Sequence, residues 1–241
     1  MEEKYLSIII PAYNEEKRLG KTLETILNYL KKKGYSYEII IVNDGSTDGT
    51  VDIAQEFIKF DSNMKIINND KNMGKGYSVK RGVLEASGKY ILFTDSDLST
   101  PIEEFKKLLT PLESGYDIAI GSRSMKESNV VVHQPFYREI MGKIFNKLVK
   151  AFVVKGFIDT QCGFKLFKKD AAKNIFNNQK LNGFSFDVEI LYLAIKDNLK
   201  IKEVPIKWFN SPKSHVSLVG SSYRMFMELL KIKRIHSKTL Q

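Results

Sequence analysis

Two carboxylates that follow a buried run are the sharpest candidates for chemistry in this sequence. Asp95-Ser96-Asp97 is separated from the apolar run Ile91-Leu92-Phe93 by Thr94 alone, so two acidic side chains appear where the chain leaves the core. Carboxylates this close repel each other unless a cation or solvent compensates them. A divalent ion that bridges a carboxylate and a diphosphate would be such a cation. A solvated turn before a helix that starts near Ser99 is the alternative explanation.

Two further polar clusters could bind a ligand. Asn43-Asp44-Gly45-Ser46 follows a strand-like run and could recognise a base or a ribose, although turn and cap chemistry explains the same residues. Asn72-Met73-Gly74-Lys75-Gly76 opens a helical pattern with glycines, a lysine and free backbone amides, which suits an anion. The cluster at Asn72 to Gly76 lacks the Gly-x-x-x-x-Gly-Lys-Ser/Thr spacing of a phosphate loop, so an ATPase is disfavoured.

Alternating strands and helices must position these clusters. Hydrophobic periodicity predicts strands over 6–11, 38–42, 64–67, 90–94 and 117–120, and helices over 15–33, 47–60, 76–86 and 101–112. Helices between strands imply crossover connections, so we predict an α/β fold with a mainly parallel, doubly wound sheet and helices on both faces. Such sheets bind ligands at the carboxyl ends of their strands. We therefore expect Tyr13-Asn14-Glu15, Asn43-Asp44-Gly45-Ser46 and Asp95-Ser96-Asp97, which follow the first, second and fourth strands, to meet at one rim.

The second half of the chain has a looser pattern. Residues Ser122 to Gln134 are polar and predict a loop. Residues Phe136 to Phe152 form an amphipathic segment, and Tyr223, Phe226, Met227 and Leu230 fall at helical spacing among basic residues in the last segment, to Arg234. Both segments could pack on the core or lie at an anionic membrane surface.

Composition and charge limit the possible partners. The chain has 241 residues, of which 43% are hydrophobic, and a formal net charge of +10 that favours anionic partners. Nucleic acid is disfavoured because the basic residues are scattered and the acidic Asp95-Ser96-Asp97 cluster would repel a phosphate backbone. A single cysteine, Cys162, excludes an intramolecular disulfide and a cysteine-rich zinc cluster. The sequence shows no secretory signal and no run of about 18 apolar residues, so we predict a cytoplasmic protein with at most peripheral membrane contact.

The ordered set of motifs resembles the inverting glycosyltransferases of family 2. The polyprenyl-phosphate branch is the most similar, with the dolichyl-phosphate β-glucosyltransferases nearest and the dolichyl-phosphate mannose synthases next. The resemblance rests on Pro11-Ala12-Tyr13-Asn14-Glu15, Asn43-Asp44-Gly45-Ser46-Thr47-Asp48, Asn72-Met73-Gly74-Lys75-Gly76 and Asp95-Ser96-Asp97. Later in the chain it rests on Gly121-Ser122-Arg123, Asp159-Thr160-Gln161-Cys162-Gly163-Phe164-Lys165-Leu166-Phe167 and Phe186-Asp187-Val188-Glu189. It implies a single domain over residues 1–241 of GT-A type, the nucleotide-diphospho-sugar transferase fold. A half that binds the nucleotide-sugar would span 1–121, and an acceptor half with a C-terminal amphipathic helix would span 122–241.

The resemblance assigns a donor site and a metal site. It implies that Pro11, Tyr13 and Glu15 lie along the base and ribose of the nucleotide-sugar and that Asp44 accepts hydrogen bonds from the base. The remaining donor-binding residues would be Lys75, Asp95, Ser96 and Asp97. Asp95 and Asp97 would also hold Mg²⁺ or Mn²⁺, and His215 is a further candidate metal ligand. Such a metal would neutralise charge on the leaving group.

The acceptor side is argued from charge. A polyprenyl phosphate is already an anion, so it needs cations to hold it rather than a base. By resemblance Arg123 and Arg138 would bind this phosphate, with Lys143 as a third candidate; Arg123 and Arg138 could instead be solvated surface residues. An acceptor hydroxyl would need a general base.

The candidates for that base and its surroundings come from the resemblance. Asp187 is the family candidate for the base, with Glu189 nearby. The other candidate catalytic residues are Asp97, Asp159 and Gln161. Asp187 could instead cap the helix that follows it.

The expected reaction is the inverting transfer of a hexose to a lipid phosphate. We predict glucose from UDP-glucose as the donor group and a dolichyl or undecaprenyl phosphate as the acceptor. A GDP-mannose donor, or the hydroxyl of a glycan or glycolipid as acceptor, are the alternatives. The enzyme would act at the cytoplasmic face of a membrane, through direct peripheral contact or through a membrane-protein partner.

Overall fold

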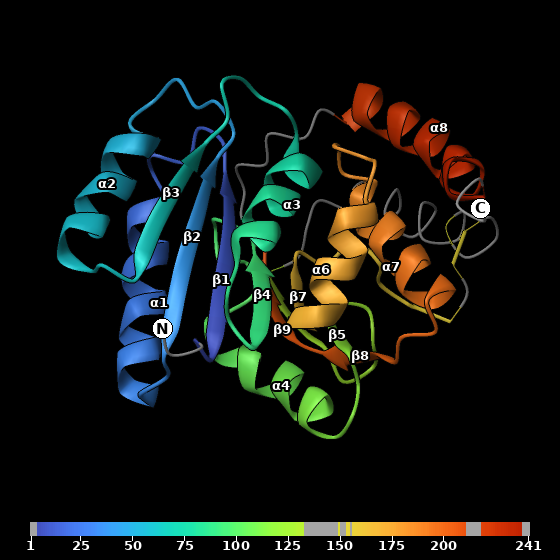
Figure 1. Ribbon diagram of the computed structural model, residues 1–241, viewed down its shortest axis with the longest axis horizontal. Helices are drawn as coiled ribbons and strands as arrows, with labels where there is room; N and C mark the ends of the chain where they lie inside the picture. The colour runs from blue at the N-terminus through green and yellow to red at the C-terminus, as the bar shows by residue number, and fades with distance from the viewer. Residues whose placement is uncertain (1–3, 133–148, 150–152, 155, 211–217, 238–241) are drawn as a thin grey trace.

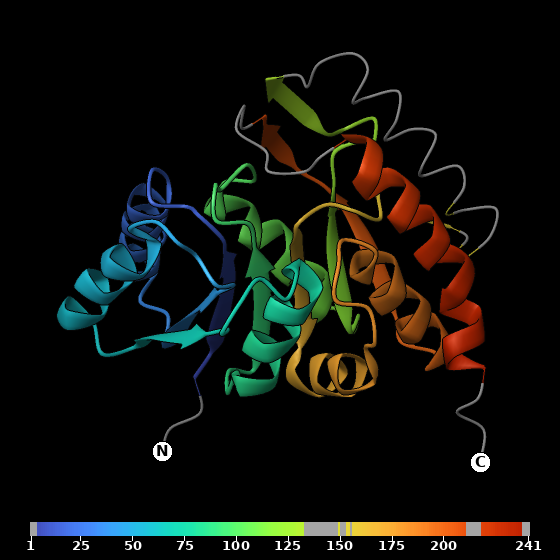
Figure 2. The ribbon, with the colours of Figure 1, turned by 90° about the horizontal axis from the view of Figure 1, so that it is seen from above.

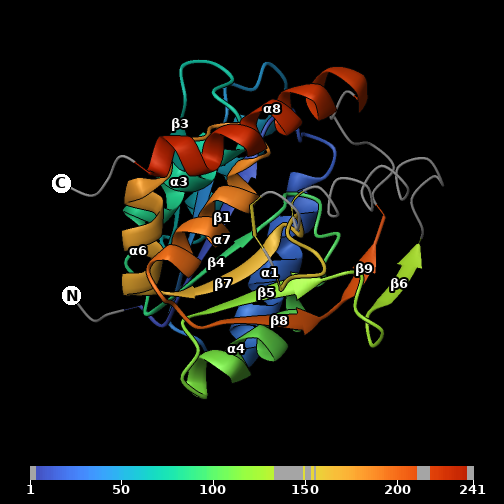
Figure 3. The same ribbon diagram turned by 90° about the vertical axis from the view of Figure 1, so that its right-hand side faces the viewer.

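A seven-stranded sheet forms the centre of the molecule. The computed structural model describes residues 4–132, 149, 153–154, 156–210 and 218–237, without the side chains of 218–224 and 226. The strands lie in the order β3-β2-β1-β4-β7-β5-β8, and Figure 1 shows them in this order from left to right. A separate two-stranded sheet pairs β6 with β9, and Figure 3 shows it beyond the edge of the main sheet.

The elements alternate along the chain as expected for crossover connections. The strands are β1 (Leu6–Ala12), β2 (Tyr37–Asn43), β3 (Met64–Asn68), β4 (Tyr90–Thr94), β5 (Ile118–Ser122), β6 (Asn129–Val132), β7 (Phe164–Lys168), β8 (Ile201–Pro205) and β9 (Lys207–Phe209). The helices are α1 (Leu19–Lys33), α2 (Thr50–Phe60), α3 (Lys75–Glu85), the 3-10 helix η1 (Ile102–Glu104), α4 (Phe105–Glu113), α6 (Lys169–Asn178), α7 (Phe186–Lys196) and α8 (Leu218–His236).

Helices cover both faces of the sheet. Successive strand residues point to opposite faces, so Ile8 and Ile10 pack in one core cluster with residues of α1, α2 and α4, while Ile9 packs in the other with residues of α3, α6, α7 and α8. Figure 2 shows α8 running beside α7 at one side of the molecule. The predicted α/β sheet with helices on both faces is confirmed.

The sheet is mainly parallel, with one reversed strand. The pairs β1–β2, β1–β4, β2–β3 and β5–β8 are parallel. Strand β7 lies antiparallel between β4 and β5. Strand β7 was not predicted from the sequence, because its five residues carry two lysines and lack the continuous apolar run of β1 or β4.

Three predicted elements differ in the structure. The stretch Ser122 to Gln134 was predicted as a loop but contains β6, which pairs with β9. The last segment forms the predicted helix, α8, but the apolar residues that it buries are Leu229 and Ile232, whereas Met227 and Leu230 are exposed. Helix α1 begins at Leu19 rather than at Glu15.

Most of the amphipathic segment Phe136 to Phe152 lies outside the described residues. Within this segment the structure describes only Val149. Among the helices that the structure describes, none has both the length and the apolar content needed to cross a bilayer.

Candidate donor and transfer site

A cavity of about 580 Å³ opens at the carboxyl ends of β1, β2 and β4. The eight residues predicted to bind the donor all line it: Pro11, Tyr13, Glu15, Asp44, Lys75, Asp95, Ser96 and Asp97. The expected meeting of the polar clusters at one rim of the sheet is therefore confirmed. The opposite wall comes from residues 182–184, before α7, and from Met225 and Glu228 of α8.

Glu15 is held by Arg18, an arginine that was not among the predicted site residues. Arg18 donates from Nε to Glu15 Oε2 and from Nη2 to Oε1, both at 2.7 Å. The Nη1 atom of Arg18 also lies 3.6 Å from Asp97 Oδ2. Arg18 therefore bridges the first and fourth strand ends and brings a cation into the cavity. Its signal in the sequence is the i, i+3 spacing from Glu15.

Asp44 binds the backbone of the glycine-rich cluster Asn72-Met73-Gly74-Lys75-Gly76. Its Oδ1 accepts hydrogen bonds from Met73 N at 2.9 Å and from Asn69 Nδ2 at 2.7 Å, and its Oδ2 accepts one from Gly74 N at 2.9 Å. The prediction that the amides of this cluster are free for an anion is wrong for Met73 and Gly74, because the carboxylate of Asp44 already occupies them. These backbone amides do bind an anion, as predicted, but the anion is the carboxylate of Asp44 in the same chain.

Asp95 is paired with Lys75, which belongs to the glycine-rich cluster before α3. Lys75 Nζ lies 2.5 Å from Asp95 Oδ1 and 6.0 Å from the centre of the Phe93 ring. Burial disfavours the charged lysine, but Asp95 and then Asp187 outweigh it, so the pKa of Lys75 lies above its ordinary value. A Cβ atom on Gly163 would lie 2.1 Å from Asp95 Oδ2. Gly163 therefore leaves the space that the Asp95 carboxylate fills.

Ser96 and Asp97 lie in the turn after β4. Asp97 Oδ1 accepts a hydrogen bond from Ser99 N at 2.9 Å, and Thr22 Oγ1 of α1 donates to Ser96 O at 2.7 Å. Asp97 therefore makes the turn contact that was the alternative reading, while it also lines the cavity. The two readings are compatible because one carboxylate oxygen is enough for the turn.

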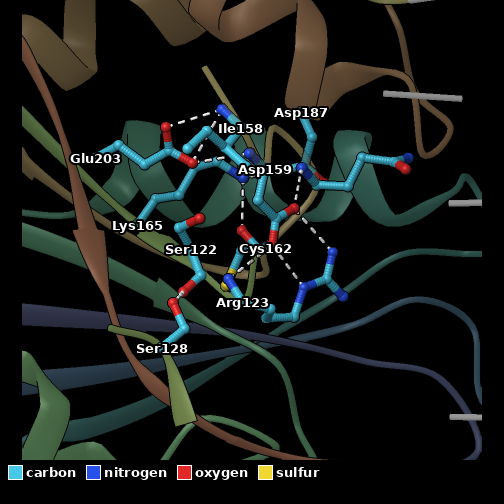
Figure 4. A network of polar contacts seen from close by, with 10 residues as sticks. Ser122, Arg123, Ser128, Ile158, Asp159, Cys162, Lys165, Asp187 and Glu203 are labelled. Atoms are coloured by element: carbon cyan, nitrogen blue, oxygen red, sulfur yellow. Dashed lines mark hydrogen bonds and ion pairs between the residues drawn. The ribbon is translucent and has the colours of Figure 1, made fainter. Parts of the chain in front are cut away.

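Asp187 lies in the first turn of α7, near the Asp95–Lys75 pair. It is 3% exposed and is bound to Lys165 of β7, whose side chain is fully buried. Lys165 Nζ also donates to Cys162 O at 2.6 Å (Figure 4). Burial raises the pKa of Asp187 against the pull of Lys165 and Lys75. The cap reading of Asp187 is wrong, because Ser185 holds the N-cap position of α7.

Arg123 and Asp159 form a second ion pair. Arg123 donates from Nε to Asp159 Oδ2 at 2.7 Å and from Nη2 to Oδ1 at 2.9 Å. The backbone amide of Arg123 also donates to Asp159 Oδ2 at 3.0 Å (Figure 4), and the backbone amide of Gln161 donates to Oδ1 at 3.2 Å. These four bonds use about all the lone pairs of a carboxylate. Arg123 is thus an ordered residue rather than a solvated surface one.

The Arg123–Asp159 pair also orders the loop before β7. Burial would raise the pKa of the fully buried Asp159, but the Arg123 guanidinium outweighs it and the pKa lies below its ordinary value. Glu203 of β8 accepts hydrogen bonds from Ile158 N and Asp159 N at 2.9 and 2.8 Å. These contacts fix the segment that brings Gly163 against Asp95.

Three predicted site residues, Arg138, Lys143 and His215, lie outside the described residues. Within the part of the chain that the structure describes, no group of three His, Cys, Asp or Glu side chains could hold a metal ion. Asp95 and Asp97 nevertheless offer hard oxygen ligands on the cavity wall, which is the donor set that Mg²⁺ and Mn²⁺ prefer. The residues present therefore fit an ion that takes its other ligands from a diphosphate and water.

The sequence matches a known family and several relatives within it. Residues 7–176 match the family described as Glycosyl transferase family 2. The chain is 38% identical over 240 residues to a dolichyl-phosphate beta-glucosyltransferase of Trichomonas vaginalis, covering 95% of this chain and 72% of that protein. The enzymes of the same name from Saccharomyces cerevisiae and Homo sapiens are 37% and 35% identical, over 96% and 95% of this chain and 75% of each relative.

Solved structures share the fold at low sequence identity. Mannosyl-3-phosphoglycerate synthase of Rubrobacter xylanophilus gives a TM-score of 0.73 at 16% identity, over 99% of this chain and 76% of that one. Glucosyl-3-phosphoglycerate synthase of Mycobacterium tuberculosis, solved with Mn²⁺, uridine diphosphate and glucosyl-3-phosphoglycerate, gives 0.67 at 17% identity, over 95% and 79%. The fold is therefore of the expected GT-A type.

Proposed function

The chain belongs to glycosyl transferase family 2 and is a glycosyltransferase, and we propose that it transfers glucose from UDP-glucose to a polyprenyl phosphate with inversion at the anomeric carbon. The observation that carries this proposal is the 38% identity, over 95% of the chain, to a dolichyl-phosphate beta-glucosyltransferase. A dolichyl or an undecaprenyl phosphate is the acceptor class. The cavity at the strand ends is the place for the donor.

The cavity has the size and the groups that a nucleotide-sugar requires. A volume of about 580 Å³ lies within the range of ordinary ligand pockets. Pro11 and Tyr13 offer an apolar edge and a ring for the base, and Tyr13 is 36% exposed at the rim. Arg18 and Lys75 bring cations toward the place of the diphosphate. We therefore assign the base to the β1 side of the cavity and the diphosphate to the β4 side.

Asp95 and Asp97 are the residues that would hold Mg²⁺ or Mn²⁺ together with the donor. The bound ion would neutralise the charge that builds on UDP as it leaves. Lys75 and Arg18 already balance these two carboxylates. Their charges therefore become available to the diphosphate when the carboxylates take up a cation. His215 stays a candidate further ligand outside the described residues.

Transfer to a phosphate needs no general base. An anionic oxygen of the lipid phosphate attacks the anomeric carbon, the bond from that carbon to the diphosphate breaks, and UDP leaves with the electron pair. The arrangement of the acidic residues agrees with this chemistry, because Asp187 is buried against Lys165 and Asp159 is saturated by Arg123. We assign Asp187, Asp159 and Gln161 to ordering the site. Arg123, whose side chain is 27% exposed, would hold the lipid phosphate, with Arg138 and Lys143 as further candidates.

The outer face of α8 supports a peripheral membrane contact at the cytoplasmic face. Met227, Leu230, Lys231 and Arg234 are exposed, and their spacing places them on one side of the helix. Apolar and cationic side chains on one helix face suit the headgroup layer of an anionic membrane. Flotation with anionic liposomes should therefore fall for a Met227→Ser, Leu230→Ser variant. Equal flotation of the variant would show that this face is not the contact, and no flotation of the wild-type chain would favour recruitment by a membrane protein.

The reaction is tested with radiolabelled UDP-glucose, Mg²⁺ and a short-chain polyprenyl phosphate. We expect a labelled product that extracts into organic solvent and requires all three components. GDP-mannose in place of UDP-glucose and a glycolipid in place of the phosphate test the alternative donor and acceptor. If no combination of UDP-glucose with a polyprenyl phosphate gives lipid-extractable label, the proposed function is wrong.

A further inference from the structure

Glu189 is a buried carboxylate that the transfer reaction does not use. It is fully buried in α7, and both of its oxygens accept hydrogen bonds from backbone amides. Oε1 accepts from Lys180 N and Oε2 accepts from Leu181 N, both at 2.8 Å. His236 Nε2, at the end of α8, lies 2.6 Å from Oε1. Because the carboxylate already accepts two backbone hydrogens, the imidazole is the donor in this third contact.

The segment that Glu189 holds is a wall of the donor cavity. Residues Asn182 and Gly183, directly after the two bonded amides, line the cavity opposite the strand ends. The segment also packs against the start of α3, because a Cβ atom on Gly74 would lie 2.5 Å from Asn182 O and one on Gly76 would lie 2.8 Å from Leu181 O. Lys75 lies between these two glycines. The position of the wall and the position of Lys75 therefore depend on each other.

His236 ties α8 to the same carboxylate. The imidazole is 2% exposed, and Lys196 Nζ of α7 donates to His236 O at 2.7 Å. One helical face of α8 carries both this anchor and the cavity-lining residues Met225 and Glu228. Figure 2 shows α8 lying along α7 over this part of the molecule. A single buried carboxylate thus joins the cavity wall to the helix that covers it.

We propose that Glu189 is a positioning residue of the donor cavity, which fixes the 180–183 wall against α3 and is itself held by His236 of α8. The inference rests on the proposed function only in taking the ligand of this cavity to be a nucleotide-sugar. Glutamine at position 189 keeps the volume but must turn an NH₂ group toward one of the two backbone amides, which are donors as well. At least one wall contact is therefore lost without a cavity being made.

The test compares Glu189→Gln and His236→Phe with the conservative His236→Gln, which keeps a donor for Glu189. Ile232→Val is the matched control, because Ile232 is fully buried on the same face of α8 but its aliphatic side chain cannot hydrogen-bond to Glu189 or to the wall segment. Two readouts are taken on the full chain: hydrogen exchange at the amides of Lys180 and Leu181, and the dissociation constant of UDP with Mn²⁺. Where turnover is measurable, the donor KM and kcat are added.

We expect Glu189→Gln to accelerate exchange at Lys180 and Leu181 and to weaken UDP binding by about tenfold, the effect of roughly one hydrogen bond. The donor KM should rise by a similar factor with kcat nearly unchanged. His236→Phe should act in the same direction, His236→Gln should restore most of the loss, and Ile232→Val should leave both readouts unchanged.

Two results would overturn the proposal. Exchange at Lys180 and Leu181 that stays at the wild-type rate in Glu189→Gln would show that the wall does not depend on Glu189, whatever ligand the cavity takes. An equal loss of UDP binding in Ile232→Val would show that only the general packing of α8 matters. A wild-type chain that binds no UDP would instead refute the proposed donor, and the exchange experiment would still decide the role of Glu189.

Discussion

Replacing Gly163 with Ala separates the catalytic geometry from the stability of the fold. The three atoms nearest to the added Cβ all belong to the Asp95 carboxylate, at 2.1, 2.5 and 2.6 Å. The nearest must reach about 3.4 Å for an ordinary contact, so the carboxylate has to move by about 1.3 Å. This movement breaks the 2.5 Å ion pair of Asp95 with Lys75.

The magnitude follows from that displacement. A misplacement of about 1 Å in a reacting geometry costs about 100-fold in rate, so kcat/KM for glucosyl transfer should fall by about that factor. Stability should change by less than about 1 kcal/mol, because the displaced group is the end of a side chain and the backbone at Gly163 is outside the left-handed region.

Transfer kinetics and urea denaturation of the same protein measure both effects. Gly20→Ala in α1 is the control, since its Cβ would meet no atom closer than 3.6 Å and alanine favours a helix. A Gly163→Ala enzyme with activity within about threefold of wild type would refute the assigned role of Asp95, because a displacement of about 1.3 Å predicts a far larger loss. A loss of stability above about 3 kcal/mol would mean that the backbone had moved instead.

Three further outcomes are expected. Arg123→Met leaves the buried Asp159 without its counter-ion, so the free energy of unfolding should fall by about 3 to 5 kcal/mol in urea; a fall below about 1 kcal/mol would contradict a buried pair. The lowered pKa of Asp159 stabilises the fold fully above the unfolded value of about 3.9, and this contribution is lost as the pH falls through the lower folded value. Asp159→Asn should therefore flatten the acid side of the stability profile, and an unchanged acid side would argue against the shift. Asp97→Asn should weaken Mn²⁺-dependent UDP binding by about tenfold or more in calorimetry, whereas wild-type affinity would place the cation elsewhere.

The first half of the fold follows from local patterns in the sequence. The runs around Ile8, Ile40 and Leu92 are continuously apolar rather than alternating, and their residues are buried on both faces of the sheet. This is the pattern of central parallel strands. The strand ends agreed with the prediction to within about two residues, as at Leu6–Ala12 and Met64–Asn68. Strand β7 did not follow from such a pattern, because its buried Lys165 is compensated by Asp187, which is 22 residues away in the sequence.

The sequence by itself determined that the polar residues after β1, β2 and β4 meet at the donor cavity. Polar residues that follow parallel strands must come to one edge of the sheet, whatever the rest of the chain does. Asp44, Asp95 and Asp97 therefore lie at one cavity, as the order of strands and clusters predicted.

The tertiary structure alone decided how these residues are paired. Asp44 binds the amides of Met73 and Gly74, Asp95 binds Lys75, and the far wall of the cavity comes from the second half of the chain. The reason is physical: periodicity fixes where a side chain leaves its strand or helix, whereas the partner of a buried charge is fixed by packing between elements distant in sequence.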